Sequence, residues 1–73
     1  METIPASEWT AGEIRAQLAR SRRTQAELAD HLGLSNAAVS RRLSGFTPID
    51  VNEIEAIADF LGVPASQLMR AAS

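Results

Sequence analysis

Residues 24–45, TQAELADHLGLSNAAVSRRLSG, decide the fold, because they contain the signals for two short helices joined by a tight turn. Thr24 and Glu27 have the spacing of a capping box, which predicts that a helix begins there. Gly33 stands where a helix commonly ends in a left-handed residue, a conformation that costs glycine little. Ser35 is a favourable N-cap for a second helix. The stretch therefore predicts a helix, a glycine turn and a second helix.

The second of these helices, expected over residues 35–43, has two different sides. Val39 and Leu43 lie one turn apart and predict a buried stripe. The other side carries small, polar and basic side chains, namely Asn36, Ala37, Ser40 and Arg41. An apolar back and a short polar front are suited to presenting that front to a binding partner.

The region before this stretch predicts an N-terminal arm followed by one helix. Residues 1–9 have little periodicity, and we expect them to form the arm. Thr10 and Glu13 repeat the capping-box spacing, so the first helix is expected to begin at Thr10. Trp9 is then placed to pack onto Ile14 as a hydrophobic staple.

The region after residue 45 predicts two more helices. Asp50 and Glu53 repeat the cap signature, and a strong apolar stripe follows at helical spacing, made of Ile54, Ile57, Ala58 and Leu61. A last short helix is expected to begin near residue 63 and to dock Leu68 and Met69 on the core. The fold class expected is therefore all-α, a compact bundle of about five short helices, with residues 10–73 as one helix-turn-helix domain.

Composition excludes several classes of function. The 73 residues allow one modest core and include no cysteine, so no disulfide or thiolate metal site is expected. A lone histidine, His31, makes a poor zinc site, and no cofactor or small-molecule ligand is evident. No activated-nucleophile arrangement or phosphate-binding loop is present, so we do not expect an enzyme. No membrane-spanning run or signal-peptide pattern is found, which predicts a cytoplasmic location.

Charge is distributed unevenly along the chain, although the net charge is only −2. Residues 15–42 carry six arginines against two acidic residues, while the rest of the chain carries one arginine against seven acidic residues. Such polarity suits a protein that binds a polyanion with one face. The alternative is that these charges only coat solvated helix faces.

The quoted stretch resembles the helix-turn-helix of the phage lambda-repressor and Cro-like family, also called XRE. The resemblance covers residues 11–69, because IEAIADFLGVPASQL at residues 54–68 is similar to the fourth and fifth helices of that family. In that family the second helix of the pair enters the major groove of DNA, while the first grips phosphate. Two departures are Arg42, where an aromatic or apolar residue is frequent, and the pair Arg22-Arg23, which replaces a glycine and an apolar residue.

The resemblance implies a set of DNA contacts. Gln25 matches a glutamine that contacts phosphate, and Ser44 matches a position near the far phosphates. The residues expected to face base edges are Asn36, Ala37, Ser40 and Arg41. To the phosphate contacts we add the two caps and the neighbouring arginines, so that this set reads Arg22, Arg23, Thr24, Gln25, Ser35, Arg42 and Ser44.

The hypothesis is a sequence-specific transcriptional regulator, a phage-type or bacterial repressor or Cro-like protein. It would bind a pseudo-palindromic double-stranded operator, as a homodimer that pairs around Leu68 and Met69 or through a further domain. Half-sites would lie about 34 Å apart. The alternative is a protein-interaction module such as an antitoxin, which would expose an apolar patch larger than a few hundred Å² near the C-terminus.

Overall fold

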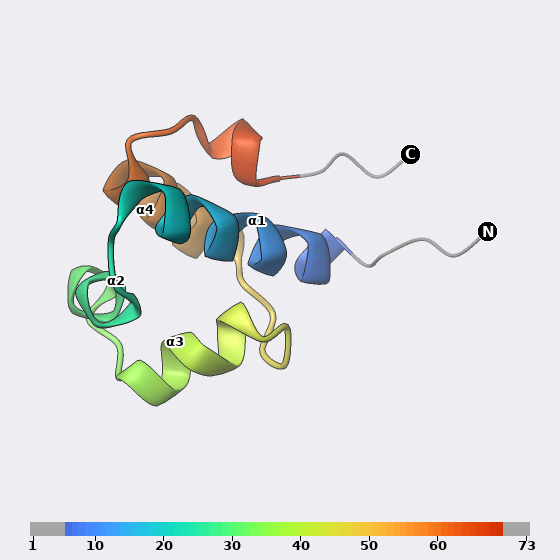
Figure 1. The fold of residues 1–73 in the computed structure, drawn as a ribbon. Helices are drawn as coiled ribbons and strands as arrows, with labels where there is room; N and C mark the ends of the chain where they lie inside the picture. Colours follow the sequence, from blue (N-terminus) through green and yellow to red (C-terminus); the bar gives the residue numbers. More distant parts are fainter. Residues whose placement is uncertain (1–5, 70–73) are drawn as a thin grey trace.

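The computed structural model describes residues 6–69, which form α-helices and one 3₁₀ helix and contain no strand. The elements, drawn in Figure 1, are α1 (Ala6–Ser21), α2 (Gln25–Leu32), α3 (Asn36–Leu43), α4 (Val51–Leu61) and the 3₁₀ helix η1 (Ala65–Leu68). The predicted all-α bundle of five short elements is confirmed. In the view of Figure 1, α3 runs along the edge of the molecule opposite η1.

The two helices of the quoted stretch begin and end where the cap residues predict. Thr24 and Glu27 form the full capping box: the Thr24 hydroxyl accepts from the Glu27 N–H at 3.0 Å, and the Glu27 carboxylate accepts from the Thr24 N–H at 2.8 Å. Gly33 follows α2 with φ +69°, in the left-handed region where a side chain is strained. The Ser35 hydroxyl accepts from the Ala38 N–H at 3.1 Å and caps α3.

The caps of α4 are also as predicted. The Asp50 carboxylate accepts from the Glu53 N–H at 2.8 Å, and the Glu53 carboxylate accepts in return from the Asp50 N–H at 3.2 Å. Gly62 ends the helix with φ +72°. These caps fix where α4 begins and ends, and the apolar stripe of the helix faces the other helices.

The start of α1 differs from the prediction. The helix begins at Ala6 rather than at Thr10, so the predicted arm is wrong over residues 6–9, while residues 1–5 lie outside the described residues. Thr10 is 4% exposed and lies inside the helix, where its burial outweighs the local capping signal. The Glu13 carboxylate instead accepts from Gln17 and Arg20, on the following turns of the same helix.

Each element contributes at least one large, fully buried side chain to the core. Those that are fully buried are Ile14, Leu28, Val39, Ile57 and Leu68. Burying a side chain of this kind contributes about 1.5–3 kcal/mol. Met69 is 40% exposed, so the prediction that it docks on the core is wrong. The reason is that η1 is a single 3₁₀ turn that ends at Leu68, so Met69 lies beyond the turn that buries Leu68.

Candidate nucleic-acid interface

The outer side of α3 is open to solvent along its whole length. Val39 and Leu43 are 1% and 5% exposed and fix the inner side of the helix against the core. The four residues predicted to face base edges are all exposed and lie together on the other side: Asn36, Ala37, Ser40 and Arg41. Within the described part of the chain, the Arg41 side chain has no hydrogen bond or ion pair. Its guanidinium is therefore available to a partner.

The first residue of α2 lies next to the first residue of α3. The side-chain amide of Gln25 donates to the Asn36 carbonyl at 3.3 Å, which joins the beginnings of the two helices. This bond uses one of the two amide N–H groups of Gln25 and leaves its side-chain carbonyl and the second N–H for other partners. The site therefore combines a helix N-terminus with the exposed front of α3, and a helix N-terminus favours anions.

The two caps and Ser44 also lie at this surface. Thr24 and Ser35 are exposed, and each hydroxyl oxygen accepts a backbone N–H of its own helix. The Thr24 hydroxyl proton is donated to Glu27 at 3.0 Å. Ser44 stands at the end of α3, where its hydroxyl donates to the Arg41 carbonyl at 3.0 Å.

The helix-turn-helix arrangement of α2 and α3 agrees with a comparison of sequences. A helix-turn-helix family matches the chain over residues 14–68, which is most of its length. The chain belongs to the lambda-repressor/Cro-like helix-turn-helix family. A search of curated proteins finds no match for it.

Solved structures share the helix-turn-helix fold. A hypothetical transcription factor, NHTF, from Neisseria is 28% identical with a TM-score of 0.81, and the match covers 96% of this chain and 85% of that one. The SOS-response repressor LexA from Eubacterium rectale is 20% identical with a TM-score of 0.80, over 100% and 78% of the two chains. The DNA-binding domain of BldD is 17% identical with a TM-score of 0.77, over 94% and 100%.

Arg22 of the helix-turn-helix domain is exposed and has an unusual backbone. Its φ of +58° is the only positive value at a non-glycine residue in the described chain. The N–H of Arg22 donates to the Ala19 carbonyl and that of Arg23 to the Leu18 carbonyl, which is the Schellman pattern that ends α1. Arg22 therefore occupies a position that favours glycine, and the sequence comparison with the family likewise places a glycine there.

Arg23 is directed toward α4 rather than toward α3. Its guanidinium carbon lies 4.4 Å from the centre of the Phe60 ring, and Nη1 donates to the Phe60 carbonyl at 3.1 Å. The other neighbour of that ring is His31, with ring centres 5.1 Å apart. Arg23 thus stabilises the contact of the α1–α2 connection with the end of α4. This engagement with Phe60 counts against the phosphate contact expected of Arg23.

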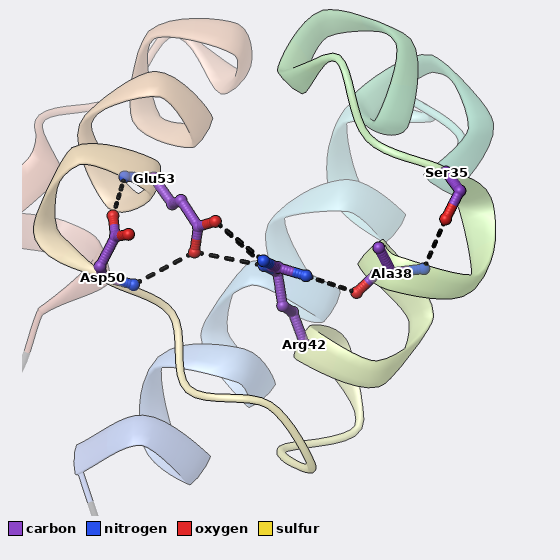
Figure 2. A network of polar contacts seen from close by, with 5 residues as sticks. All are labelled: Ser35, Ala38, Arg42, Asp50 and Glu53. Atoms are coloured by element: carbon purple, nitrogen blue, oxygen red, sulfur yellow. Dashed lines mark hydrogen bonds and ion pairs between the residues drawn. The ribbon is translucent and has the colours of Figure 1, made fainter.

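Arg42 joins α3 to α4, as Figure 2 shows. Its Nε lies 3.2 and 3.1 Å from the two carboxylate oxygens of Glu53, and Nη2 lies 3.1 Å from Oε2. Nη1 donates to the Ala38 carbonyl at 3.0 Å. The side chains of Arg42 and Glu53 are only 18% and 21% exposed. These contacts engage the Arg42 guanidinium with α4 and with its own helix, which counts against the expected phosphate contact.

Sequence reasoning missed Arg15 of α1. Its side chain is exposed, and Nη1 donates to the Leu43 carbonyl at the end of α3. Together with Gln25, Ser40 and Ser44 it lines a groove beside α3. Arg15 stands in no motif, so the only signal in the sequence was its membership of the basic stretch.

The caps also shape the electrostatics around α2. The N–H and the hydroxyl of Thr24 hold the pKa of the Glu27 carboxyl below its usual value, because both donate to the ionised form.

Within residues 6–69, no group of three or more His, Cys, Asp or Glu side chains could hold a metal ion. In the same residues, no helix is long and apolar enough to cross a membrane.

Proposed function

We propose that this helix-turn-helix protein is a DNA-binding transcriptional regulator that recognises specific double-stranded sequences by placing α3 in the major groove. The observation that carries the proposal is the exposed row on α3, held outward by a buried inner side. Family membership supports it, as does the likeness to a Neisseria protein described as a hypothetical transcription factor. A helix of this kind fits the width of the major groove, which is about 12 Å.

The chemistry of the α3 front matches the edges of DNA bases. The Asn36 amide can pair with N6 and N7 of adenine, and the Arg41 guanidinium with O6 and N7 of guanine. The Ala37 methyl can contact a thymine methyl, and the Ser40 hydroxyl can serve either purine or pyrimidine. Their common exposure on one helix side means that all four can face one stretch of groove.

Phosphate contacts are assigned to the groups beside this front. Gln25 at the N-terminus of α2 is the central one, because the amides of a helix N-terminus attract anions. The cation Arg22 lies three residues before it, and the hydroxyls of Thr24, Ser35 and Ser44 are exposed at the helix ends. Arg23 and Arg42 leave the set, because Phe60 and Glu53 hold their guanidinium groups.

The regulator is proposed to act in the cytoplasm by occupying an operator, as a phage-type or bacterial repressor or Cro-like protein does. Two copies would bind the halves of a pseudo-palindromic site about 34 Å apart. Leu68 is fully buried and cannot contribute to a dimer interface without leaving the core, whereas Met69 is exposed beside it. Pairing at the end of the domain would therefore use Met69.

Selection of random duplex DNA by the purified protein tests this function. We expect an enriched motif, repeated in inverted orientation if two copies bind together. The same selection with Asn36→Ala and with Arg41→Ala should relax the motif at different base pairs. Equal recovery of all sequences by the unaltered protein would contradict specific recognition, and absence of binding at low salt would contradict the function as a whole.

The interaction-module alternative is less well supported by the surface. It requires an extended apolar patch near the C-terminus. The exposed large hydrophobic residues in the described part of the chain are Phe46, Val51 and Met69, and only Met69 lies at the C-terminal end. Within residues 6–69, the large apolar surface exposed at that end is therefore one side chain rather than a patch.

A further inference from the structure

A groove of about 330 Å³ runs beside the recognition helix, where α1, α2 and α3 meet. It is lined by Arg15, Gln25, Ser40, Leu43 and Ser44. Liquid water occupies about 30 Å³ per molecule, so the groove has room for several waters or for a partly hydrated phosphate group. Three of its lining residues already belong to the proposed DNA contacts, and the groove therefore opens at the DNA-facing side.

The lining of this groove carries a positive charge and no negative one. Arg15 supplies the cation, while the amide of Gln25 and the hydroxyls of Ser40 and Ser44 are neutral hydrogen-bonding groups. A second groove, of about 250 Å³, is different, because Asp50 and Glu53 are among the residues that line it. Of the two, only the groove beside α3 has the charge that an anion requires.

Arg15 retains donors for a ligand. An arginine side chain has five N–H groups in a planar fork, and the structure uses Nη1 of Arg15 for the Leu43 carbonyl. Within residues 6–69 Arg15 has no ion pair, whereas Arg20 on the same helix pairs with Glu13 at 3.3 Å. The charge of Arg15 is therefore not neutralised by the protein.

We propose that this groove seats a backbone phosphate of bound DNA, with Arg15 from α1 as its cation and Gln25 and Ser44 as flanking hydrogen-bond groups. The proposal rests on the proposed function, since it names a further contact of the same DNA-binding surface. The bond from Arg15 to Leu43 holds the guanidinium at the end of α3 before DNA arrives. The phosphate then lies on the strand that borders the recognition helix.

The experiment measures the salt dependence of duplex binding for the unaltered protein, Arg15→Gln and Arg20→Gln. Glutamine at position 15 can still donate to the Leu43 carbonyl but carries no charge, so this variant separates the effect of the hydrogen bond from the effect of the positive charge. Loss of one phosphate contact should reduce the slope of log K against log salt by about 0.9 and weaken selected and random duplexes alike. Arg20→Gln, which removes a paired arginine outside the groove, should leave the slope unchanged.

A duplex with single phosphates replaced by uncharged methylphosphonates locates the contact. One position should weaken the unaltered protein several-fold and leave Arg15→Gln unaffected. Two outcomes would overturn the proposal while the domain still binds DNA. One is an unchanged salt slope for Arg15→Gln. The other is that every methylphosphonate weakens Arg15→Gln by the same factor as it weakens the unaltered protein. If Arg15→Gln does not fold, Arg15→Lys must keep the slope and the sensitive position, and a lower slope there would count against the site. If the unaltered protein binds no duplex, the proposed function itself fails.

Discussion

At the scale of single residues, Arg22 combines a strained backbone with a proposed binding role. Its φ of +58° lies in the left-handed region, which costs a residue with a Cβ about 1–2 kcal/mol. Glycine avoids this cost, and the Schellman hydrogen bonds at the end of α1 do not depend on the side chain. The strain therefore persists at a position where the proposed gain is a charge close to DNA.

Replacing Arg22 by glycine separates these two effects. Arg22→Gly should raise the free energy of unfolding by about 1 kcal/mol, because the left-handed backbone is relaxed. It should also lower the salt slope of DNA binding by about 0.9. Urea unfolding and binding titrations measure the two quantities. Arg22→Ala is the control, since it removes the charge and keeps the strained backbone; the same stability gain in both variants would refute this account.

Arg41 tests base recognition at the same scale. Arg41→Ala should weaken binding to the selected site by about 1–3 kcal/mol and relax the preference at one base pair. Gln25→Ala, in contrast, should weaken every sequence alike, because phosphate carries no sequence information. Titration of the selected duplex against single-base variants distinguishes them. A uniform loss for Arg41→Ala would reassign Arg41 to phosphate.

At the scale of elements, the helices are fixed by their caps and by one connection between α3 and α4. The capping boxes at the starts of α2 and α4 satisfy backbone donors that would otherwise be unpaired. Glu53 has two functions, because it completes the α4 box and also receives the Arg42 guanidinium from α3. A change in one carboxylate therefore affects both the start of α4 and the position of α3.

Glu53→Gln tests this connection. The amide can still accept from the Asp50 N–H, but the charge that holds Arg42 is lost, so the free energy of unfolding should fall by about 1–2 kcal/mol. Glu55→Gln on the same helix is the matched control, since Glu55 is exposed, and its effect should stay within about 0.5 kcal/mol. Chemical unfolding measures both. Combining Glu53→Gln with Arg42→Gln should show a loss smaller than the sum, and strict additivity would mean that the pair is not coupled.

The capping box of α2 predicts a pH dependence. Thr24 lowers the pKa of Glu27 in the folded protein, so the ionised carboxylate contributes stability above the pKa it has when unfolded. That contribution is lost as pH falls through the lowered, folded pKa. Glu27→Gln should therefore be less stable than the unaltered protein at neutral pH, and the gap in stability should close as the pH falls through the lowered pKa of Glu27. Thermal melts across this range measure the gap, and a gap that stays constant with pH would argue against the carboxylate.

At the scale of the whole molecule, α4 is acidic, whereas the exposed arginines lie on other elements, which also carry Glu8, Glu13, Glu27 and Asp30. Among the described residues, α4 carries Glu53, Glu55 and Asp59 and no basic residue, whereas the exposed arginines lie on α1, α3 and the α1–α2 connection. A field of this shape orients the approach of a polyanion, because one face attracts it and the other repels it.

Removing charge from α4 should change the rate of association more than its specificity. The double variant Glu55→Gln and Asp59→Asn should raise the association rate with duplex DNA roughly threefold at low salt and leave the selected motif unchanged. The effect should shrink as the Debye length falls from about 30 Å at 0.01 M to about 8 Å at 0.15 M salt. Stopped-flow mixing measures the rate, and equal rates at low salt would show that these charges do not steer binding.

The fold was largely predictable because its signals are local. Caps and glycines set α2, α3 and α4, and the exposed front of α3 follows from its apolar back. The start of α1 was not predictable from the sequence, since the burial of Thr10 depends on tertiary packing. The intramolecular partners of Arg23 and Arg42 were not predictable for a related reason: Phe60 and Glu53 lie 37 and 11 residues away from them in sequence. Their proximity is a property of the packed helices.

The ion pair between Arg42 and Glu53 has a consequence for redesign of the domain. A third helix transplanted from a relative with an aromatic or apolar residue at position 42 would leave Glu53 without its cation in a half-buried setting. Grafts that alter target preference should therefore carry positions 42 and 53 together as one unit. The reverse exchange, moving this helix into an unrelated host, would need an acidic residue supplied on the neighbouring helix.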